Sequence, residues 1–579
     1  MSQNYMFPTS KKEVEALGWD YIDVIMVTGD AFIDHPSFGT AVIARWLQKF
    51  GYRVAVIPQP NWRDDLRDFR KLGAPRLFFG VNSGAMDSMV NHYTAQKRLR
   101  HDDAYTPEGM FGHRPDYAVT VYTKILKSLY PDVPVVIGGI EASLRRLTHY
   151  DYWQDKLFPS ILVGSGADYL CYGMGERPMI ELTRAIEAGR NFRQMLQIPQ
   201  IGFYLKGEPK VKDAFVLSSY EECLKSKKAF AENFHHIETI ANMMHPPVIV
   251  EPVGDGYVRI NPPYPPATQE EMDSFWDLPF TKLPHPRYKG KRIPAYDMIK
   301  FSINTHRGCF GGCNFCTIAA HQGKFIQSRS ENSILREVEG LNKLPGFAGN
   351  ISDLGAPTAN MYGMKGRNPA LCDVCRRKSC LFPSPCKNMD RDHSRLLDLY
   401  KRVDSVPGIR HSYIGSGIRY DLFLSEEGYV DQSSRPYLKE LVLNHTSGRL
   451  KVAPEHTQDN VLYYMAKPSF RLFEKLRAEF DSITSKAGRK TGIVPYFISS
   501  HPGCTMHDME KLASHPALKG LYMEQVQDFT PTPMTTSSVM FYSGLDPRTM
   551  KPVFAEHNPE KKQMQKSYFF RRKDFSKKK

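Results

Sequence analysis

Apolar, strand-like runs alternate with helix-like segments along the first part of the chain. Within Thr40–Phe50 the apolar residues recur with the spacing of one helix face, whereas the neighbouring apolar runs are short and rich in β-branched residues. These strand-like runs are Tyr21–Thr28, Arg53–Ile57, Arg76–Val81 and Val133–Gly138. The alternation predicts βαβ units, and therefore an α/β domain over residues 1–190 that is built on a doubly wound parallel sheet.

A second alternating series begins near residue 299. Its strand-like runs are Ile299–His306, Asn350–Leu354, His411–Gly415, Arg449–Ala453, Gly492–Ser499 and Leu521–Phe529. The helix-like segments between them include Ser330–Asn342, Gln458–Met465, Ser469–Ala487 and Met506–Leu518. Six such units predict an open (βα)6 partial TIM barrel over residues 296–560, and in α/β barrels the chemistry gathers at the carboxyl ends of the strands.

Two further regions lack this rhythm. Residues 191–295 contain proline runs at 261–266 and 283–286, which favour extended connectors, so we predict a small subdomain and a Pro-rich linker there. Residues 561–579 carry nine Lys or Arg and one Asp, and we predict a basic disordered tail. The chain has 579 residues, more than one hydrophobic core usually organises, which agrees with several domains.

The charge of the chain is unevenly distributed. The formal net charge is +15, but +8 of it falls in residues 561–579, so the rest of the chain is only mildly basic. We therefore do not favour nucleic acid as a partner, although the tail could attract RNA. The sequence contains neither an apolar run of about 18 residues nor a signal peptide, so we expect a cytoplasmic protein without a membrane partner.

The segment Thr305–Thr317 reads T-H-R-G-C-F-G-G-C-N-F-C-T and places Cys309, Cys313 and Cys316 in one short loop. Thiolates are soft ligands that suit iron–sulfur clusters and zinc, and the glycines let the backbone wrap closely around a metal core. A closed structural site takes four protein ligands, so three leave one metal position open. A zinc knuckle that takes its fourth ligand from elsewhere is the alternative.

The cysteine spacing resembles the signature of the radical S-adenosylmethionine (radical SAM) superfamily. Longer runs make the chain similar to the YgiQ-type radical SAM proteins over nearly its whole length; they lie at residues 319–323, 326–330, 416–419, 451–456 and 527–533. The resemblance implies that the three cysteines bind a [4Fe-4S] cluster and that the open iron binds S-adenosylmethionine. It also implies an external low-potential electron donor, whereas the substrate and the reaction of this family are unassigned.

The resemblance further implies which residues contact S-adenosylmethionine. They lie at the ends of successive predicted strands or in the cysteine loop, and they are Phe315, Gly355, Ala356, Pro357, Ser416, Arg419, Glu455 and His456. The acidic member that usually accompanies the family's glycine-rich stretch is absent at residues 355–358, so we expect backbone carbonyls to substitute. No residue of the sequence is singled out as a catalytic acid or base.

A second cysteine group lies in an insertion at residues 365–392 between the second and third predicted strands. It reads Cys372-x2-Cys375-x4-Cys380-x5-Cys386 and supplies four ligands, enough to close a metal site. Spacing alone does not distinguish an auxiliary iron–sulfur cluster from a structural zinc ion, and free thiols remain a third reading. The basic run at residues 376–378 could compensate thiolate charge.

The segment Asp34–Gly39 resembles the opening of the cobalamin-binding type of Rossmann-like domain. In that family the cobalt-ligating histidine lies in a D-x-H-x-x-G pattern, whereas here His35 follows Asp34 directly. We therefore predict that residues 1–190 have the Rossmann-like fold and that cobalamin is not a cofactor. The other reading of His35 is a turn residue that caps the following helix.

These observations predict a radical SAM enzyme that cleaves S-adenosylmethionine reductively and begins radical chemistry on an unknown substrate. Two alternatives stay open. One is a nucleic-acid-binding protein stabilised by zinc or iron–sulfur clusters, and the other is a radical SAM enzyme that modifies RNA.

Overall fold

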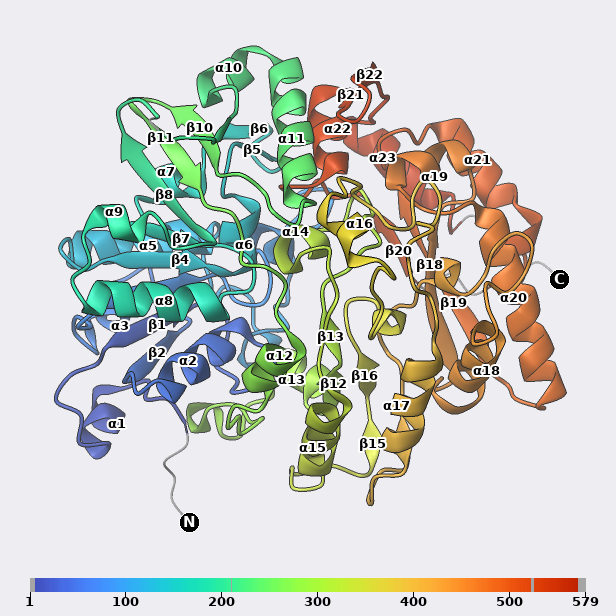
Figure 1. Cartoon of the computed structure of the whole chain (residues 1–579), viewed down its shortest axis with the longest axis horizontal. Helices are drawn as coiled ribbons and strands as arrows, with labels where there is room; N and C mark the ends of the chain where they lie inside the picture. The colour runs from blue at the N-terminus through green and yellow to red at the C-terminus, as the bar shows by residue number, and fades with distance from the viewer. Residues whose placement is uncertain (1–5, 210, 522–524, 571–579) are drawn as a thin grey trace. The chain divides into compact units, whose positions relative to one another are not determined.

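The computed structural model describes residues 6–209, 211–521 and 525–570, and the chain forms two compact units (Figure 1). The first unit comprises the chain up to Asn233 together with His245–Ala267 and Asp273–Lys300. The second comprises Phe234–Met244, Thr268–Met272 and the chain from Phe301 onward. The main division between the units falls after Lys300.

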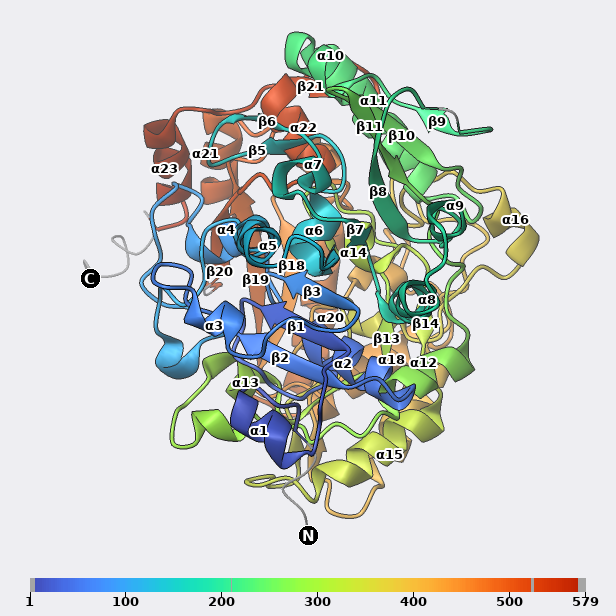
Figure 2. The same cartoon turned by 90° about the vertical axis from the view of Figure 1, so that its left-hand side faces the viewer.

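The first unit contains a large, mainly parallel sheet, which confirms the predicted α/β class (Figures 1 and 2). Its parallel strands, in spatial order, are β2 (Val54–Pro58), β1 (Val24–Thr28), β3 (Phe78–Asn82), β4 (Val135–Gly138) and β7 (Tyr169–Cys171). Every residue of β1, β2 and β3 is buried. Near-continuous apolar runs are typical of strands that are covered on both faces, as parallel sheets in α/β proteins are.

Helices connect and cover these strands. Those of the first unit are α1 (Lys11–Ala16), α2 (Gly39–Lys49), α3 (Arg67–Arg70), α4 (Ser88–His92), α5 (Ala118–Leu129), α6 (Gly139–Leu144), α7 (Ile161–Ser165), α8 (Glu176–Glu187), α9 (Phe192–Met195), α10 (Tyr220–Lys225) and α13 (Pro294–Ile299). Helix α2 packs against α8, and α5 packs against α7. Helices α11 (Lys227–Ala241) and α12 (Gln269–Trp276) have residues in both units.

The sheet continues beyond residue 190, where we predicted a separate small subdomain in 191–295. Strands β8 (Ile201–Lys206), β11 (Gly256–Ile260) and β10 (Ile249–Val253) add to it in antiparallel order, and β9 (Phe215–Val216) is parallel to β10. The apolar runs of these strands extend the sheet beyond β7, and the proline run at 261–266 begins only after β11, where it breaks no hydrogen bond between strands.

In the second unit, strand segments pair with one another in chain order, and every pairing along this path is parallel. Strand β12 (Ser302–Asn304) pairs with β16 (Asp353–Gly355), and β15 (Asn350–Ile351) pairs with β17 (His411–Ser412). A bridge from Ile418 to Val452 leads to β18 (Arg449–Glu455). Strands β19 (Gly492–Ser499) and β20 (Gln525–Asp528) complete the order, although residues 522–524 of the predicted sixth strand lie outside the described residues.

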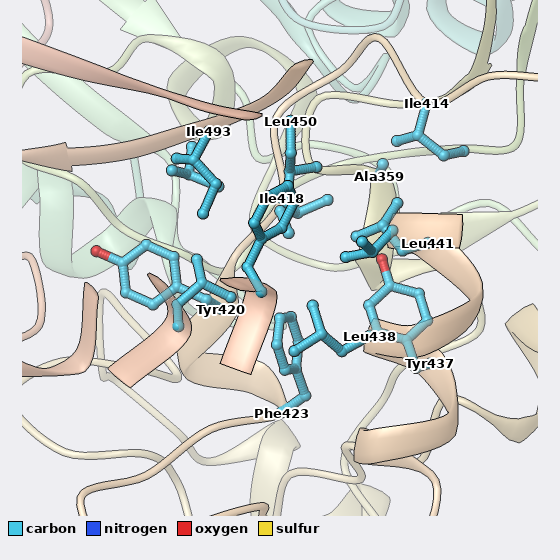
Figure 3. Close-up of a cluster of buried hydrophobic side chains, with 14 of the residues drawn as sticks. Ala359, Ile414, Ile418, Tyr420, Phe423, Tyr437, Leu438, Leu441, Leu450 and Ile493 are labelled. Carbon is cyan, nitrogen blue, oxygen red and sulfur yellow. The ribbon is translucent and has the colours of Figure 1, made fainter. Parts of the chain in front are cut away.

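Helices follow these strands. They are α15 (Glu331–Leu341), α17 (Ser394–Asp404), α18 (Ser434–Asn444), α19 (Asp459–Met465), α20 (Phe470–Lys486), α21 (Met506–Ser514), α22 (Thr536–Ser543) and α23 (Pro559–Ser567). Most of them bury one face, whereas α22 buries every residue from Thr536 to Phe541. Strand residues such as Leu450 and helix residues such as Leu441 belong to one core cluster. Figure 3 shows part of this cluster, where Ile418, Tyr437 and Leu438 lie together.

The predicted disordered tail at 561–579 is wrong for its first part, because Lys561–Ser567 belong to helix α23. Asn558 caps this helix by accepting hydrogen bonds from the backbone of Glu560 and Lys561, and Pro559 occupies its first turn. Lys562 and Gln565 are buried, and Gln565 accepts a 3.0 Å hydrogen bond from the backbone of Ser500. The lysine-rich composition led us to overlook the helix start at Asn558 and Pro559. Residues 571–579 lie outside the described residues.

Among the described helices, none has the length and apolar character needed to cross a membrane.

Candidate metal centre

The loop with Cys309, Cys313 and Cys316 follows the first parallel strand of the second unit. It lies between β13 (His306–Arg307) and α14 (Ile318–Gln322), and β13 pairs with β14 (Gln327–Ser328) just beyond that helix. Just before the loop, the backbone of Thr305 donates a 2.8 Å hydrogen bond to the carbonyl of Gly355. The loop therefore begins beside the end of the second strand, β16, as the carboxyl-end rule for α/β barrels predicts.

Two glycines allow the loop to pass close to neighbouring backbone. Gly308 has φ +89°, and a Cβ there would lie 2.2 Å from the carbonyl oxygen of Phe325. Gly312 has φ +64°, and a Cβ there would lie 2.6 Å from the Cβ of Ser379. Both positions therefore need glycine for conformation and for space.

Polar groups lie beside two of the three cysteine sulfurs. The guanidinium of Arg419 donates a 3.2 Å hydrogen bond to Cys313 Sγ, and Thr358 Oγ1 lies 3.5 Å from Cys309 Sγ. Burial raises the pKa of Cys309, and it raises the pKa of Cys316 to about 12. Because burial disfavours the thiolates, a cation or metal is needed to keep these sulfurs charged.

Arg419 is fixed on both sides. Its Nε donates a 2.9 Å hydrogen bond to Asp421, and its backbone exchanges hydrogen bonds with the Asn360 side chain. Burial opposes ionisation of Asp421, but the charge and hydrogen bonds of Arg419 together with the charge of Lys467 outweigh burial and lower the Asp421 pKa. The guanidinium is thus a buried, permanently charged group aimed at Cys313.

The second and third strands meet at an acidic side chain that our sequence analysis missed. Asp353 Oδ1 accepts hydrogen bonds from the backbone N–H groups of Gly415 at 2.8 Å and Ser416 at 3.0 Å, and the Ser416 hydroxyl donates to Asp353 Oδ2. A Cβ on Gly355 would lie 2.6 Å from Ser416 Oγ. We expected no acidic residue at this strand end. Asp353 lies two residues before Gly355 in β16, and an acidic residue at that distance from the glycine was the signal that the sequence offered.

The remaining residues that we predicted to contact S-adenosylmethionine in the cysteine loop and at this strand end differ in burial and in their partners. Ala356 is buried, Pro357 is half-buried, and the Gly355 carbonyl already accepts the Thr305 hydrogen bond. Phe315 packs against the core cluster and lies edge-on to His501 at a ring distance of 6.1 Å.

Glu455 and His456 lie in different surroundings although they are adjacent. Glu455 is buried with φ +67°, and its carboxylate is 3.5 Å from Lys467 Nζ. The high pKa of Cys316 is due first to burial, then to the neighbouring thiols, and to a smaller extent to the charge of Glu455. His456 instead accepts a 3.1 Å hydrogen bond from the backbone of Gln458, and its Nε2 is 3.7 Å from Cys504 Sγ. Burial lowers the His456 pKa to about 3, so the ring is neutral at pH 7.

The residue Asn314, inside the cysteine loop, was also missed by the sequence analysis. Its Nδ2 donates a 2.8 Å hydrogen bond to the carbonyl of Tyr464, and its Oδ1 accepts a 2.7 Å hydrogen bond from Lys378. Its backbone carbonyl accepts from the N–H of Ser537 at 2.9 Å. Asn314 therefore ties the loop to three distant segments of the second unit, which no local pattern indicates.

In the described part of the chain, no three histidine, cysteine or acidic side chains converge as they would around a single metal ion. The case for a metal centre therefore rests on three thiols in one loop, a guanidinium on one sulfur and a backbone that only glycine allows.

In the first unit, Asp34 and His35 have structural partners. Arg45 Nε donates a 3.0 Å hydrogen bond to Asp34, and both side chains are buried. His35 Nδ1 accepts a 3.1 Å hydrogen bond from the backbone of Ser37. The turn part of our alternative reading of His35 agrees with this bond, but the expected capping of the following helix does not, because α2 begins after Phe38 without a side-chain cap.

Comparison with known proteins places these features in a class. Residues 6–302, slightly more than half of the chain, match the family described as Radical SAM N-terminal, and residues 524–576 match a domain of unknown function, DUF3362. Together with the three-cysteine loop, the first match defines the radical SAM class.

Close relatives narrow the class to a family. A UPF0313 protein of Bacteroides thetaiotaomicron is 56% identical, and the alignment covers 97% of this chain and 93% of the relative. The UPF0313 protein YgiQ of Salmonella typhimurium is 42% identical over 93% of this chain and 81% of the relative. The chain belongs to the UPF0313 family, and the predicted similarity to YgiQ-type proteins is confirmed.

Solved structures that are similar to the chain are more distant. The radical S-adenosylmethionine methyltransferase TsrM from Kitasatospora setae, solved with cobalamin and a [4Fe-4S] cluster bound, is 15% identical with a TM-score of 0.48 over 89% of this chain and 74% of that chain. The cobalamin-dependent S-adenosylmethionine radical enzyme OxsB, with aqua-cobalamin bound, is 10% identical with a TM-score of 0.47 over 90% and 55%.

These structures contradict our expectation that cobalamin is not a cofactor, since both proteins are described with cobalamin. The expectation rested on the position of His35, and a histidine pattern tests only one way of ligating cobalt. It does not test whether the carboxyl ends of a parallel sheet can receive a cofactor. The exclusion of cobalamin is therefore withdrawn.

Proposed function

We propose that the chain is a radical SAM enzyme in which Cys309, Cys313 and Cys316 bind a [4Fe-4S] cluster. The observation that carries the proposal is the pairing of this three-cysteine loop with the buried guanidinium of Arg419, which donates to Cys313 Sγ. Three thiolates leave one iron open for the amino and carboxylate groups of S-adenosylmethionine. When bound, such a cluster would supply the electron for reductive cleavage of S-adenosylmethionine.

The chain's own residues would bind and orient these groups. Arg419 stabilises negative charge on the thiolate of Cys313, because a hydrogen bond from a cation to sulfur is stronger than one from a neutral donor. The carboxylate of Asp353, in the neighbouring strand, accepts hydrogen bonds from both the hydroxyl and the backbone N–H of Ser416. These bonds fix the orientation of the Ser416 side chain. Glu455 faces the same loop with Lys467 as its counter-charge.

The finer architecture belongs to this proposal. Parallel pairing in chain order from β12 to β20 supports an open (βα)6 barrel as the catalytic core, and the parallel part of the first sheet supports a Rossmann-like N-terminal unit. We further propose that an external low-potential electron donor supplies the electron, and that the substrate reaches the carboxyl ends of the barrel strands.

The test is anaerobic turnover without a substrate. Reconstituted, dithionite-reduced protein should convert S-adenosylmethionine slowly to 5′-deoxyadenosine and methionine, measured by liquid chromatography and mass spectrometry. Cys309→Ala should form no deoxyadenosine, whereas Cys223→Ala, which changes a buried cysteine of the first unit, should keep wild-type activity. If the reduced wild-type protein keeps its iron and sulfide but forms no deoxyadenosine, the proposal is wrong.

A further inference from the structure

The second cysteine group lies in the segment between β16 and α17, and its first two members share one turn. Helix α16 (Pro369–Asp373) is capped by Asn368 and contains Cys372, and the backbone of Cys375 donates a 3.1 Å hydrogen bond to the Cys372 carbonyl. Such a turn brings the two side chains of a C-x2-C pair to one side, as in zinc and iron–sulfur loops.

The last two members are brought together by a second loop. The backbone of Cys386 donates a 2.7 Å hydrogen bond to the carbonyl of Cys380, and Arg377 Nη2 donates to the carbonyls of Phe382 and Ser384 within that loop. Asn388, two residues after Cys386, reaches the Cys372 sulfur with its side-chain N–H. The two pairs therefore lie beside one another.

Space and hydrogen bonding are arranged around the Cys372 sulfur. A Cβ on Gly366 would lie 2.4 Å from Cys372 Sγ, so glycine leaves room for this sulfur. Asn388 Nδ2 donates a 3.4 Å hydrogen bond to the same atom. An N–H donor directed at a sulfur favours the thiolate, which is the form that binds a metal.

A buried cation lies beside the group. Lys324 is 5% exposed and donates to the carbonyl of Arg377, and in the described part of the chain no ion pair joins it to a carboxylate. Arg377 in turn donates to the carbonyl of Phe382, in the loop between Cys380 and Cys386, so Lys324 lies beside the group. A buried cation is stabilised by a nearby negative charge, which thiolates of this group would supply.

The segment also contacts the first cysteine loop directly. The backbone of Cys380 donates a 3.1 Å hydrogen bond to the carbonyl of Phe310, and Ser379 Oγ donates a 2.7 Å hydrogen bond to the carbonyl of Gly311. Cys309, Cys380 and Cys386 all pack against one small cluster of buried side chains, which are Phe310, Met361, Met364, Leu381, Met389 and Leu422. The second group thus lies next to the first loop.

We propose that Cys372, Cys375, Cys380 and Cys386 bind a second metal centre, and that this centre fixes the segment that supports the first cysteine loop. Four thiolates close a site, so no position is left open for a substrate. The proposal goes beyond the proposed function, because it holds whether or not the first loop cleaves S-adenosylmethionine. Zinc and an iron–sulfur cluster share this thiolate chemistry, and the experiment distinguishes them.

The test measures metal in the full-length protein with the first site removed. Cys309→Ala/Cys313→Ala/Cys316→Ala protein is purified anaerobically and reconstituted separately with Zn²⁺ and with iron and sulfide. Elemental analysis and Mössbauer spectra should show either about one zinc or a cluster of about four irons per chain. Adding Cys372→Ser and Cys386→Ser should reduce that metal at least tenfold, whereas adding Cys223→Ala should not.

A second measurement keeps the inference testable if the multiple variants fold poorly. In otherwise wild-type protein, Cys386→Ser should remove the second metal and at least double the rate at which a chelator extracts iron from the first site, while circular dichroism stays unchanged. Metal-free triple-variant protein with a wild-type circular dichroism spectrum, or an unchanged extraction rate after loss of the second metal, would refute the proposal. Failure of S-adenosylmethionine cleavage alone would leave this result unaffected.

Discussion

Replacement of Arg419 by methionine tests the role of the buried cation most directly. The change removes the 3.2 Å hydrogen bond to Cys313 Sγ and leaves Asp421 buried without its counter-charge. A hydrogen bond from a charged donor contributes about 1.5–3 kcal/mol, and breaking a buried ion pair costs about 3–5 kcal/mol. We therefore expect a lower melting temperature and, separately, a more negative reduction potential of the first cluster.

The two effects can be separated by a second change. Arg419→Met/Asp421→Leu removes the unpaired carboxylate, so most of the lost stability should return while the potential stays low. A hydrogen-bond energy of about 1.5–3 kcal/mol corresponds to about 65–130 mV for a one-electron reduction. This is an upper limit for the shift in reduction potential, because it assumes that the bond stabilises only one of the two oxidation states. Removing a positive charge beside the cluster makes reduction harder, and this fixes the sign.

The assay is a redox titration followed by electron paramagnetic resonance, with iron content measured in each variant. Arg419→Lys serves as the control that keeps the charge but loses the planar fork, and it should lie between wild type and Arg419→Met. An Arg419→Met protein that retains its iron and titrates within about 20 mV of wild type would show that the guanidinium does not act on the cluster.

Two further predictions concern backbone space and buried charge. Gly312→Ala should reduce the iron bound at the first site by at least half, because its Cβ would meet Ser379 at φ +64°. Gly340→Ala in α15 is the control: its Cβ would meet no atom within 4 Å, so the iron content should stay unchanged. Equal iron contents in the two variants would contradict the close packing of the loop. In the first unit, burial raises the pKa of Glu251 to about 7, so this carboxyl binds a proton more readily in the folded chain than in the unfolded chain. The free energy of unfolding should therefore fall as pH rises from about 4.5 to 7, by about 3 kcal/mol at most. Melting temperatures between pH 5 and 8 should therefore decline less in Glu251→Gln than in wild type, and parallel curves would count against this assignment.

Much of the fold could be predicted from local patterns. Runs such as Gly492–Ser499 and Arg53–Ile57 were found almost to the residue, because buried parallel strands are continuous apolar runs. The strands after residue 190 were not placed, because pairing between β8 and β11 joins residues that are about 50 positions apart and leaves no local periodicity. Helix α23 was hidden by its lysines, although Asn558 and Pro559 form an ordinary helix start.

The candidate site shows a similar division. The cysteine loop and Arg419 were named from the sequence, and the structure brings them together through one hydrogen bond. Asp353 and Asn314 were missed, since their importance comes from partners on other strands and not from neighbours in sequence. His456 was expected at the same strand ends, yet its ring turns to Cys504 because the residue accepts the N–H of Gln458.

The hydrogen bond between the backbone of Ser537 and the carbonyl of Asn314 has a consequence for biosynthesis. These residues are 223 positions apart, so at about 5–20 residues per second the ribosome needs about 10–45 s to make the second after the first. The loop around Asn314 therefore emerges with its thiols before α22 exists to complete its surroundings. Insertion of a metal core at this loop would be a late event, and a nascent chain stalled before residue 537 should present these cysteines to oxidants and delivery proteins alike.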